Sequence, residues 1–254
     1  MQALSTSLPV ESTLVPPRGI EQPLEIPSPV PGHPLRWRRV RDLMRQIKTA
    51  PDAEQKVDAA LAFFDAVGGL GGEATFQRFA TTPEGRRLLR TKPDLVALLG
   101  NREALAAMPE GSLGRAYLDF AERNGFAADG LVERNKATDR ERPDPQDPYR
   151  QWFWDRFTMA HDLWHVMTDC STEGEGEIRL LAFSYAQTPQ RGYGILLALA
   201  MSSRLLDWGF LREQLRAWRA GRRAHDLVSV PWEQYLAWPL DEVRRCFGVQ
   251  VITA

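Results

Sequence analysis

Residues 161–185 read HDLWHVMTDCSTEGEGEIRLLAFSY, and the organisation of the whole chain follows from this stretch. Two segments with apolar residues at helical spacing, one ending at Thr168 and one starting near Glu175, flank the polar sequence Asp-Cys-Ser-Thr-Glu-Gly. Apolar residues that recur every three or four positions are typical of an amphipathic helix, and a short polar loop between two such helices lets them pack against each other. We therefore expect two antiparallel helices joined by a short loop.

Four side chains in this stretch predict a metal site. His161 and His165 are four residues apart, so on a helix they lie one above the other on the same face. Asp162 lies about 100° further round, where it can reach the rim of the same site, and Glu177 falls at the start of the second helix. Two imidazoles and two carboxylates form a mixed nitrogen and oxygen ligand set that suits zinc, and also manganese or Fe(II).

Other interpretations of the histidine pair compete with a metal site. An isolated pair at this spacing also occurs by chance on a protein surface or in a core. The zinc-protease motif HExxH requires a glutamate directly after the first histidine, whereas this chain has Asp162, so a metalloprotease of that type is disfavoured. A phosphohydrolase of the His-Asp type is also disfavoured, because no separate upstream histidine and downstream aspartate follow in a matching order.

The remainder of the chain favours an all-α fold. From residue 35 onward apolar residues recur at helical spacing, and Thr82-Pro83-Glu84 supplies the N-cap, proline and acid typical of a helix start. No stretch alternates apolar and polar residues for long enough to indicate a strand. Residues 1–34 contain eight of the 18 prolines, which disfavours helix there. We expect a proline-rich extended arm over 1–34 and a single compact multi-helix bundle over 35–254, with the metal site between two helices.

The composition disfavours several classes of protein. The 254 residues carry 32 basic and 33 acidic side chains, a net charge of -1, which argues against binding to the phosphate backbone of nucleic acid. The two cysteines, Cys170 and Cys246, are too few for a disulfide framework and fit a reducing compartment. No run of 18 apolar residues is present, and the N-terminus has the pattern of neither a secretory signal nor a transit peptide.

Three segments in a common order resemble a known protein family. The segment HDLWHVMTDCSTEGEGE, residues 161–177, is similar to the HDxxH-x11-E signature of the Coq4 family of ubiquinone biosynthesis proteins. Residues 108–117, MPEGSLGRAY, resemble the PEGTLGxxY segment of that family, and residues 221–244 resemble its C-terminal segment. The resemblance covers about residues 76–248, and three ordered motifs are far more specific than the histidine pair alone.

This resemblance implies a fold, a site and an activity. It implies an all-helical protein that bears a metal ion, with zinc as the most favoured ion and iron or manganese as alternatives. The metal ligands that it implies are His161, Asp162, His165 and Glu177. The family is tied to the oxidative decarboxylation of a polyprenylated hydroxybenzoate at C1 of its ring. The alternative is a non-catalytic, lipid-binding scaffold that organises the ubiquinone biosynthetic complex.

The resemblance also implies partners and a location. The expected partners are a polyprenylated aromatic lipid, the membrane surface, other ubiquinone biosynthesis proteins and a second copy of the chain; nucleic acid is not expected. We expect a peripheral membrane protein, on the cytoplasmic face of the inner membrane if the source is bacterial. If the source is eukaryotic, we expect the matrix side of the mitochondrial inner membrane. We favour the bacterial location.

Some residues depart from the family pattern. Thr158 and Met159 stand where members commonly carry arginine and glutamate, and Leu181 and Ser184 stand where many carry lysine and glutamate. Asp169 stands where glycine is usual. Part of the charge around the predicted ligands is therefore missing, and we expect contacts with the substrate or with partners to differ accordingly.

Two later segments each admit two interpretations. The nearly all-apolar segment 193–201 could line a groove for a prenyl tail, but core packing is the favoured interpretation. A basic stripe at helical spacing follows, formed by Arg212, Arg216, Arg219 and Arg223. A basic amphipathic helix can lie on anionic lipid, and a solvated helix face explains the stripe equally well.

Overall fold

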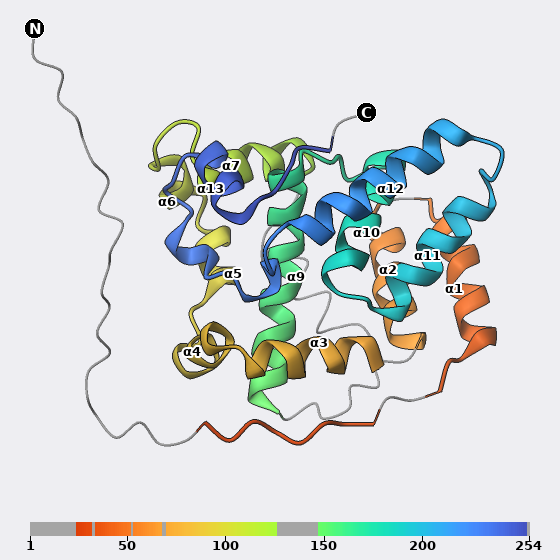
Figure 1. The fold of residues 1–254 in the computed structure, drawn as a ribbon, viewed down its shortest axis with the longest axis horizontal. Coiled ribbons are helices and arrows are strands. Elements are labelled where there is room, and N and C mark those ends of the chain that lie inside the picture. Colours follow the sequence, from red (N-terminus) through yellow and green to blue (C-terminus); the bar gives the residue numbers. More distant parts are fainter. Residues whose placement is uncertain (1–23, 32–33, 52, 68–69, 126–146, 253–254) are drawn as a thin grey trace, which may run out of the picture.

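The computed structural model describes residues 24–31, 34–51, 53–67, 70–125 and 147–252, and these residues are predominantly helical (Figure 1). The helices are α1 (Trp37–Thr49), α2 (Ala53–Ala66), α3 (Leu70–Thr81), α4 (Pro83–Thr91), α5 (Leu95–Gly100), α6 (Arg102–Ala106), α7 (Leu113–Arg123), α9 (Pro148–Thr168), α10 (Gly174–Gln187), α11 (Arg191–Ser202), α12 (Trp208–Arg223) and α13 (Leu240–Phe247), with short 3-10 turns η1 (Leu227–Ser229) and η2 (Trp232–Gln234). No strand forms in the described ranges, where one isolated bridge joins Ser112 to Pro239. The all-α prediction is confirmed.

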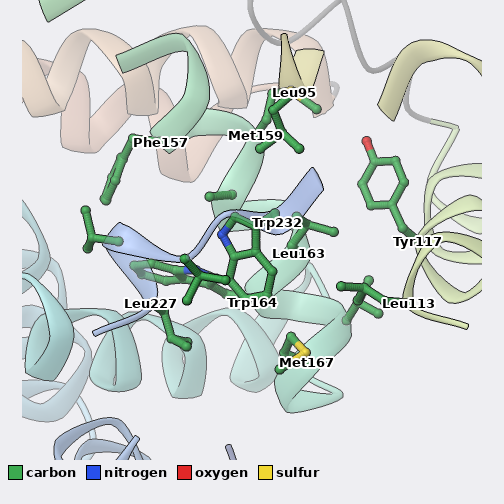
Figure 2. Packing of buried hydrophobic residues seen from close by; sticks show 14 of the residues in the cluster. Leu95, Leu113, Tyr117, Phe157, Met159, Leu163, Trp164, Met167, Leu227 and Trp232 are labelled. Carbon is green, nitrogen blue, oxygen red and sulfur yellow. The ribbon is translucent and has the colours of Figure 1, made fainter. Parts of the chain in front are cut away.

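Helix α9 runs through the middle of the molecule (Figure 1). Asp147 caps its start by accepting a hydrogen bond from the backbone N–H of Tyr149 at 2.9 Å, and a proline occupies the first helical position. Leu163 and Trp164 are fully buried in the main hydrophobic core, which also contains Trp232 of η2 (Figure 2). This burial fixes the rotation of α9 about its axis and therefore the direction of the face that carries the two histidines.

Helix α10 packs mainly against α12 and α11 and meets α9 only in a limited region. We expected α9 and α10 to pack against each other along their length. Instead they meet only in part, because α12 covers most of α10. Gly221 allows α12 to approach α10 closely: a Cβ atom there would lie 2.5 Å from the carbonyl oxygen of Phe183. In addition, the side-chain amide of Gln187 donates to the Gly221 carbonyl at 2.6 Å.

We expect Gly221→Ala to lower the free energy of unfolding by about 2 kcal/mol, because overpacking of this contact outweighs the gain of about 1 kcal/mol in helix propensity. The control is Gly209→Ala in the same helix, where a Cβ would meet only the Asp207 carboxylate, at 3.3 Å. Denaturant unfolding of both variants measures the difference. A midpoint for Gly221→Ala at or above that of Gly209→Ala would contradict the close contact.

Residues 24–31 run in an extended conformation beside α3 and the start of α9 (Figure 1). Arg150 of α9 donates to the carbonyl oxygen of Ser28 at 2.9 Å and pairs with Glu73 of α3 at 2.6 Å. Burial alone would raise the pKa of Glu73, but the hydrogen bonds from Arg150 and a neighbouring glutamine amide hold it below its ordinary value. A buried ion pair therefore ties the extended segment to both helices.

The proline-rich arm is described only in part. Leu24 and Ile26 pack against the main hydrophobic core, so this portion is attached to the helical bundle. Residues 1–23 and 32–33 lie outside the described ranges. The boundary between an arm and a single domain after residue 34 therefore stays a prediction.

Candidate metal centre

Three of the four expected ligands meet where α9 and α10 approach each other. Ligand atoms of His161, His165 and Glu177 all lie within 4.8 Å of one another. The Nε2 atom of His165 is 3.2 Å from Oε2 of Glu177. Donor atoms bound to a tetrahedral zinc ion at about 2.1 Å are about 3.4 Å apart, so this separation fits two ligands that share an ion. The triad offers two nitrogen donors and one oxygen donor to a divalent metal.

The ring of His165 is oriented from two sides. Its Nδ1 atom lies 3.0 Å from the carbonyl oxygen of Cys170, and because a carbonyl can only accept a hydrogen bond, Nδ1 carries the proton. In the neutral ring the lone pair is then on Nε2, the atom that faces Glu177. Phe120 of α7 stacks on the ring, with centroids 5.5 Å apart and planes at 24°. Support of this kind from a backbone carbonyl is typical of a metal-binding histidine.

The two histidines differ in proton affinity. Burial lowers the pKa of His161 to about 4, and the charge of nearby His165 adds to this effect, so His161 is neutral at pH 7. Burial also disfavours the charged form of His165, but the hydrogen bond and charge of Glu177 outweigh burial and raise the pKa of His165 above its ordinary value. A metal ion must compete with the proton on His165, and metal affinity should therefore decrease as the pH is lowered.

Asp162 lies outside this triad, although its side chain is only 7% exposed. The charges of His165 and Glu177 nevertheless affect its pKa, so Asp162 lies beside the triad and not within it. Burial raises the pKa of Asp162 to about 7. Burial also raises the pKa of Tyr117 on α7, with a contribution from the charge of Asp162. The role of Asp162 as a fourth metal ligand stays a prediction.

The last turn of α9 is held by a segment distant in the sequence. The guanidinium of Arg244 in α13 donates to the carbonyl oxygens of Met167 at 2.9 Å and Val166 at 3.0 Å. The backbone N–H of Ile252 donates to the carbonyl of Thr168 at 2.8 Å. Carbonyls in the last turn of a helix have no partner within the helix, so these bonds fix the turn that carries the second histidine. Sequence reasoning missed this role, although Arg244 lies in the C-terminal segment that resembles Coq4.

His225 and Glu233 of the C-terminal segment are not part of the triad. His225 contacts Phe247, with ring centroids 6.3 Å apart, and His33 lies outside the described residues. Glu233 of η2 forms a buried, hydrogen-bonded ion pair with Arg156 of α9. This ion pair joins two elements of the core and has no part in the triad.

Several residues that depart from the Coq4 pattern lie on α9 or α10 or directly after α9. Leu181 and Ser184 follow Glu177 at helical spacing on α10, and both are buried. In the described part of the chain the Ser184 hydroxyl has no hydrogen-bond partner. Met159 is fully buried in the core, and Asp169 has a φ of 58°, the left-handed conformation that favours glycine. Beyond Glu177, this side of α10 therefore lacks the charges that many family members carry.

The fold and the site together define an all-helical protein in which two histidines, one turn apart on a central helix, face a glutamate from the following helix. The sequence model of the family described as "Coenzyme Q (ubiquinone) biosynthesis protein Coq4" matches residues 65–253. The chain belongs to the Coq4 family. The resemblance inferred from the sequence is confirmed.

The chain is similar to curated fungal proteins. It is 29% identical over 172 residues to the ubiquinone biosynthesis protein coq-4 of Neurospora crassa, a match that covers 66% of this chain and 47% of that protein. It is 29% identical over 175 residues to COQ4 of Podospora anserina, with 67% and 55% covered. The chain therefore spans about half the length of the curated relatives that it matches.

A crystal structure from Nostoc punctiforme, whose name refers to ubiquinone biosynthesis, has a similar fold. The two structures align with a TM-score of 0.59 at 22% sequence identity, over 87% of this chain and 100% of that chain. At this level of identity the likeness supports the fold alone.

The preference for a bacterial location is wrong. Both fungal relatives are named as mitochondrial proteins, and these names point to mitochondria instead. Among the described residues, no helix is both long enough and apolar enough to cross a membrane.

Proposed function

We propose that His161, His165 and Glu177 bind a divalent metal ion and that the chain uses it in the oxidative decarboxylation of a polyprenylated hydroxybenzoate at C1 of the ring. The observation that supports this proposal is that three protein side chains, and not four, converge on one point. Three donors meet, and a catalytic metal site keeps a further position for substrate or water. The Glu177 side chain is 35% exposed, so the triad can be approached from α10. Zinc fits this donor set best, with iron or manganese as alternatives.

Each residue has a defined part in this proposal. When bound, a divalent ion supplies Lewis acidity, which stabilises negative charge on the carboxylate or phenolate as the bond to C1 breaks. His161 and His165 hold the ion through neutral ring nitrogens, and Glu177 adds a negative charge. Asp162, with a pKa near 7, can hold or release a proton beside the site at neutral pH. Replacing a carboxylate by a hydroxyl group is a two-electron oxidation, so the reaction also requires an oxidant.

The second candidate is a non-catalytic, lipid-binding scaffold for the ubiquinone biosynthetic complex. The buried Asp162 favours this alternative, because a fourth protein ligand would close the site as in structural zinc centres. A closed site would tie α9 to α10, two helices that otherwise share only a limited contact. The metal would then stabilise the fold without taking part in chemistry.

Replacing Glu177 with glutamine separates the two candidates. Glutamine keeps the shape of the side chain but removes its charge and weakens it as a ligand, so a catalytic metal predicts a folded variant that loses decarboxylation of the prenylated hydroxybenzoate. We expect a loss of at least about a hundredfold in turnover. The measurement is quinone production in a strain that depends on this chain, together with bound metal and circular dichroism of the purified variant.

The matched control is Glu173→Gln. Glu173 lies four residues before Glu177, at the N-cap of α10, and its side chain is exposed. This variant should keep the parental metal content and the parental rate. If Glu177→Gln loses its metal, stays folded and still supports quinone synthesis at the parental rate, the catalytic proposal is wrong and the scaffold is correct.

We further propose the partners that such a role requires. They are a polyprenylated aromatic lipid, the membrane surface that presents it, other ubiquinone biosynthesis proteins and a second copy of the chain. Following the names of the fungal relatives, we place the chain in mitochondria. Of these partners, the lipid carries a long apolar tail, so its aromatic head group must pass from the membrane to a polar metal site.

A further inference from the structure

The turn between α11 and α12 exposes large apolar side chains to solvent. In this turn Leu206 is 94% exposed and Leu205 is 62% exposed, and Trp208 at the start of α12 is 74% exposed. Three of the four most exposed large hydrophobic residues in the described chain therefore lie within residues 205–208. We call residues 203–208 the α11–α12 tip. A contiguous apolar patch of this kind marks a surface that meets another apolar phase.

The outer face of α12 continues this patch with positive charge. At 100° per residue, four exposed side chains fall within about 60° of one another on the helix. They are Trp208, Arg212, Leu215 and Arg219. The one acidic residue within α12, Glu213, pairs with Arg179 of α10 at 3.0 Å. The exposed arginines of this face form no ion pair with any described residue, so the face is apolar and cationic together.

We propose that the α11–α12 tip and the outer face of α12 dock on an anionic membrane surface. An apolar tip flanked by arginines is complementary to a bilayer, because leucine and tryptophan enter the boundary of the acyl chains while the guanidinium groups stay among the phosphates. The interpretation of the basic stripe as only a solvated face leaves the exposed leucines unexplained. The proposed docking does not depend on the chemistry of the metal site.

The tip is connected to the metal centre through one ion pair. Arg204 donates to the Glu175 carboxylate at 2.6 Å, which joins the tip to the first turn of α10. Glu177 lies two residues further along that turn, with its side chain partly exposed. A bilayer that holds the tip therefore lies beside the turn that supplies the carboxylate ligand. For the prenylated substrate proposed above, this arrangement shortens the path from the membrane to the triad.

The first test replaces the two leucines, using the full chain and phosphatidylcholine vesicles with and without phosphatidylglycerol. Leu205→Ser together with Leu206→Ser should lower the partition coefficient for the anionic vesicles by about a hundredfold, about tenfold for each apolar side chain. The control, Leu98→Ser, changes an exposed leucine on α5 and should bind like the parent. Equal co-sedimentation of the double variant and the parent would overturn the proposal.

The second test addresses the charges. Replacing Arg212 and Arg219 of this face with glutamine should weaken binding by about fivefold for each residue, and binding of the parent should fall with added salt. Binding that is independent of both salt and these substitutions overturns the electrostatic part of the proposal. If the leucine variant changes the oligomeric state while vesicle binding persists, the tip is an interface between copies of the chain, and membrane docking is wrong.

A third readout reports on insertion itself. Cys246 is exposed and Cys170 is buried, so Cys246→Ser leaves one shielded thiol, and Leu206→Cys then adds an accessible position for an environment-sensitive fluorophore. The label should shift to shorter wavelength on anionic vesicles, whereas the same label on Leu98→Cys should not. No shift at either position contradicts insertion. Glu177→Gln should bind vesicles like the parent, so failure of the docking proposal and failure of the catalytic proposal are distinguishable.

Discussion

Replacing His165 with alanine should lower the affinity for a divalent metal ion by more than about a hundredfold, because it removes one of three converging donors. His165 is the best supported of the three: its Nε2 faces Glu177 at 3.2 Å, while the Cys170 carbonyl and Phe120 fix its ring. His161→Ala should have a similar effect. Elemental analysis of the purified variants and competition with a chelating indicator measure the loss.

The control for this prediction is His225→Ala, which removes a histidine that contacts Phe247 far from the triad in sequence. Its metal content should equal that of the parent. Circular dichroism should show that all three variants keep their helices, since the ring of His165 contributes only part of a large core. Unchanged metal content in both His161→Ala and His165→Ala would exclude these residues as ligands.

Replacing Asp162 with asparagine should stabilise the metal-free protein at pH 8 by up to roughly 4 kcal/mol and should have little effect at pH 4. In the unfolded chain Asp162 ionises near its ordinary pKa, whereas in the folded protein burial raises that pKa to about 7. The folded state therefore holds the proton more tightly between these values. Its stability should fall as the pH rises from about 4 through about 7, and asparagine removes this loss.

Denaturant unfolding of parent and variant across this pH range, with a chelator present, measures the effect. Asp119→Asn on the exposed side of α7 serves as the control and should show no comparable gain at high pH. A constant difference between Asp162→Asn and the parent at all pH values would mean that Asp162 keeps the same proton affinity in the folded and unfolded chains. A metal bound by Asp162 would instead appear as a loss of stability in the metal-loaded variant.

The sequence predicted the local features of the site because these depend on short spacings. Four residues of helix bring His161 above His165, and a polar loop followed by a new helical pattern places Glu177 in the first turn of α10. The direction of Asp162 could not be predicted, because a rotation of about 100° from His161 leaves it free to face either the site or the neighbouring helix. In the structure Asp162 is buried beside the triad, where the charges of His165 and Glu177 affect its pKa.

Features that depend on contacts distant in sequence were missed. Apolar periodicity identifies which face of α10 is buried but not which helix covers it, so α12 could not be recognised as its main partner. For the apolar residues of α11, core packing was the favoured prediction. In the structure Ile195 and Leu196 pack in a second hydrophobic cluster, while Leu199 is 44% exposed near the end of the helix.

The bonds from Arg244 and Ile252 to the last turn of α9 also set an order of events during synthesis. On the ribosome, α9 emerges long before either residue has been translated. Its C-terminal carbonyls stay without these partners until residue 252 has left the exit tunnel, and the turn that bears His165 is not yet fixed. A nascent polypeptide that stalls before Arg244 contains His161, His165 and Glu177 but lacks these bonds. We therefore expect the proposed metal centre to reach its final geometry only after residue 252 has been translated.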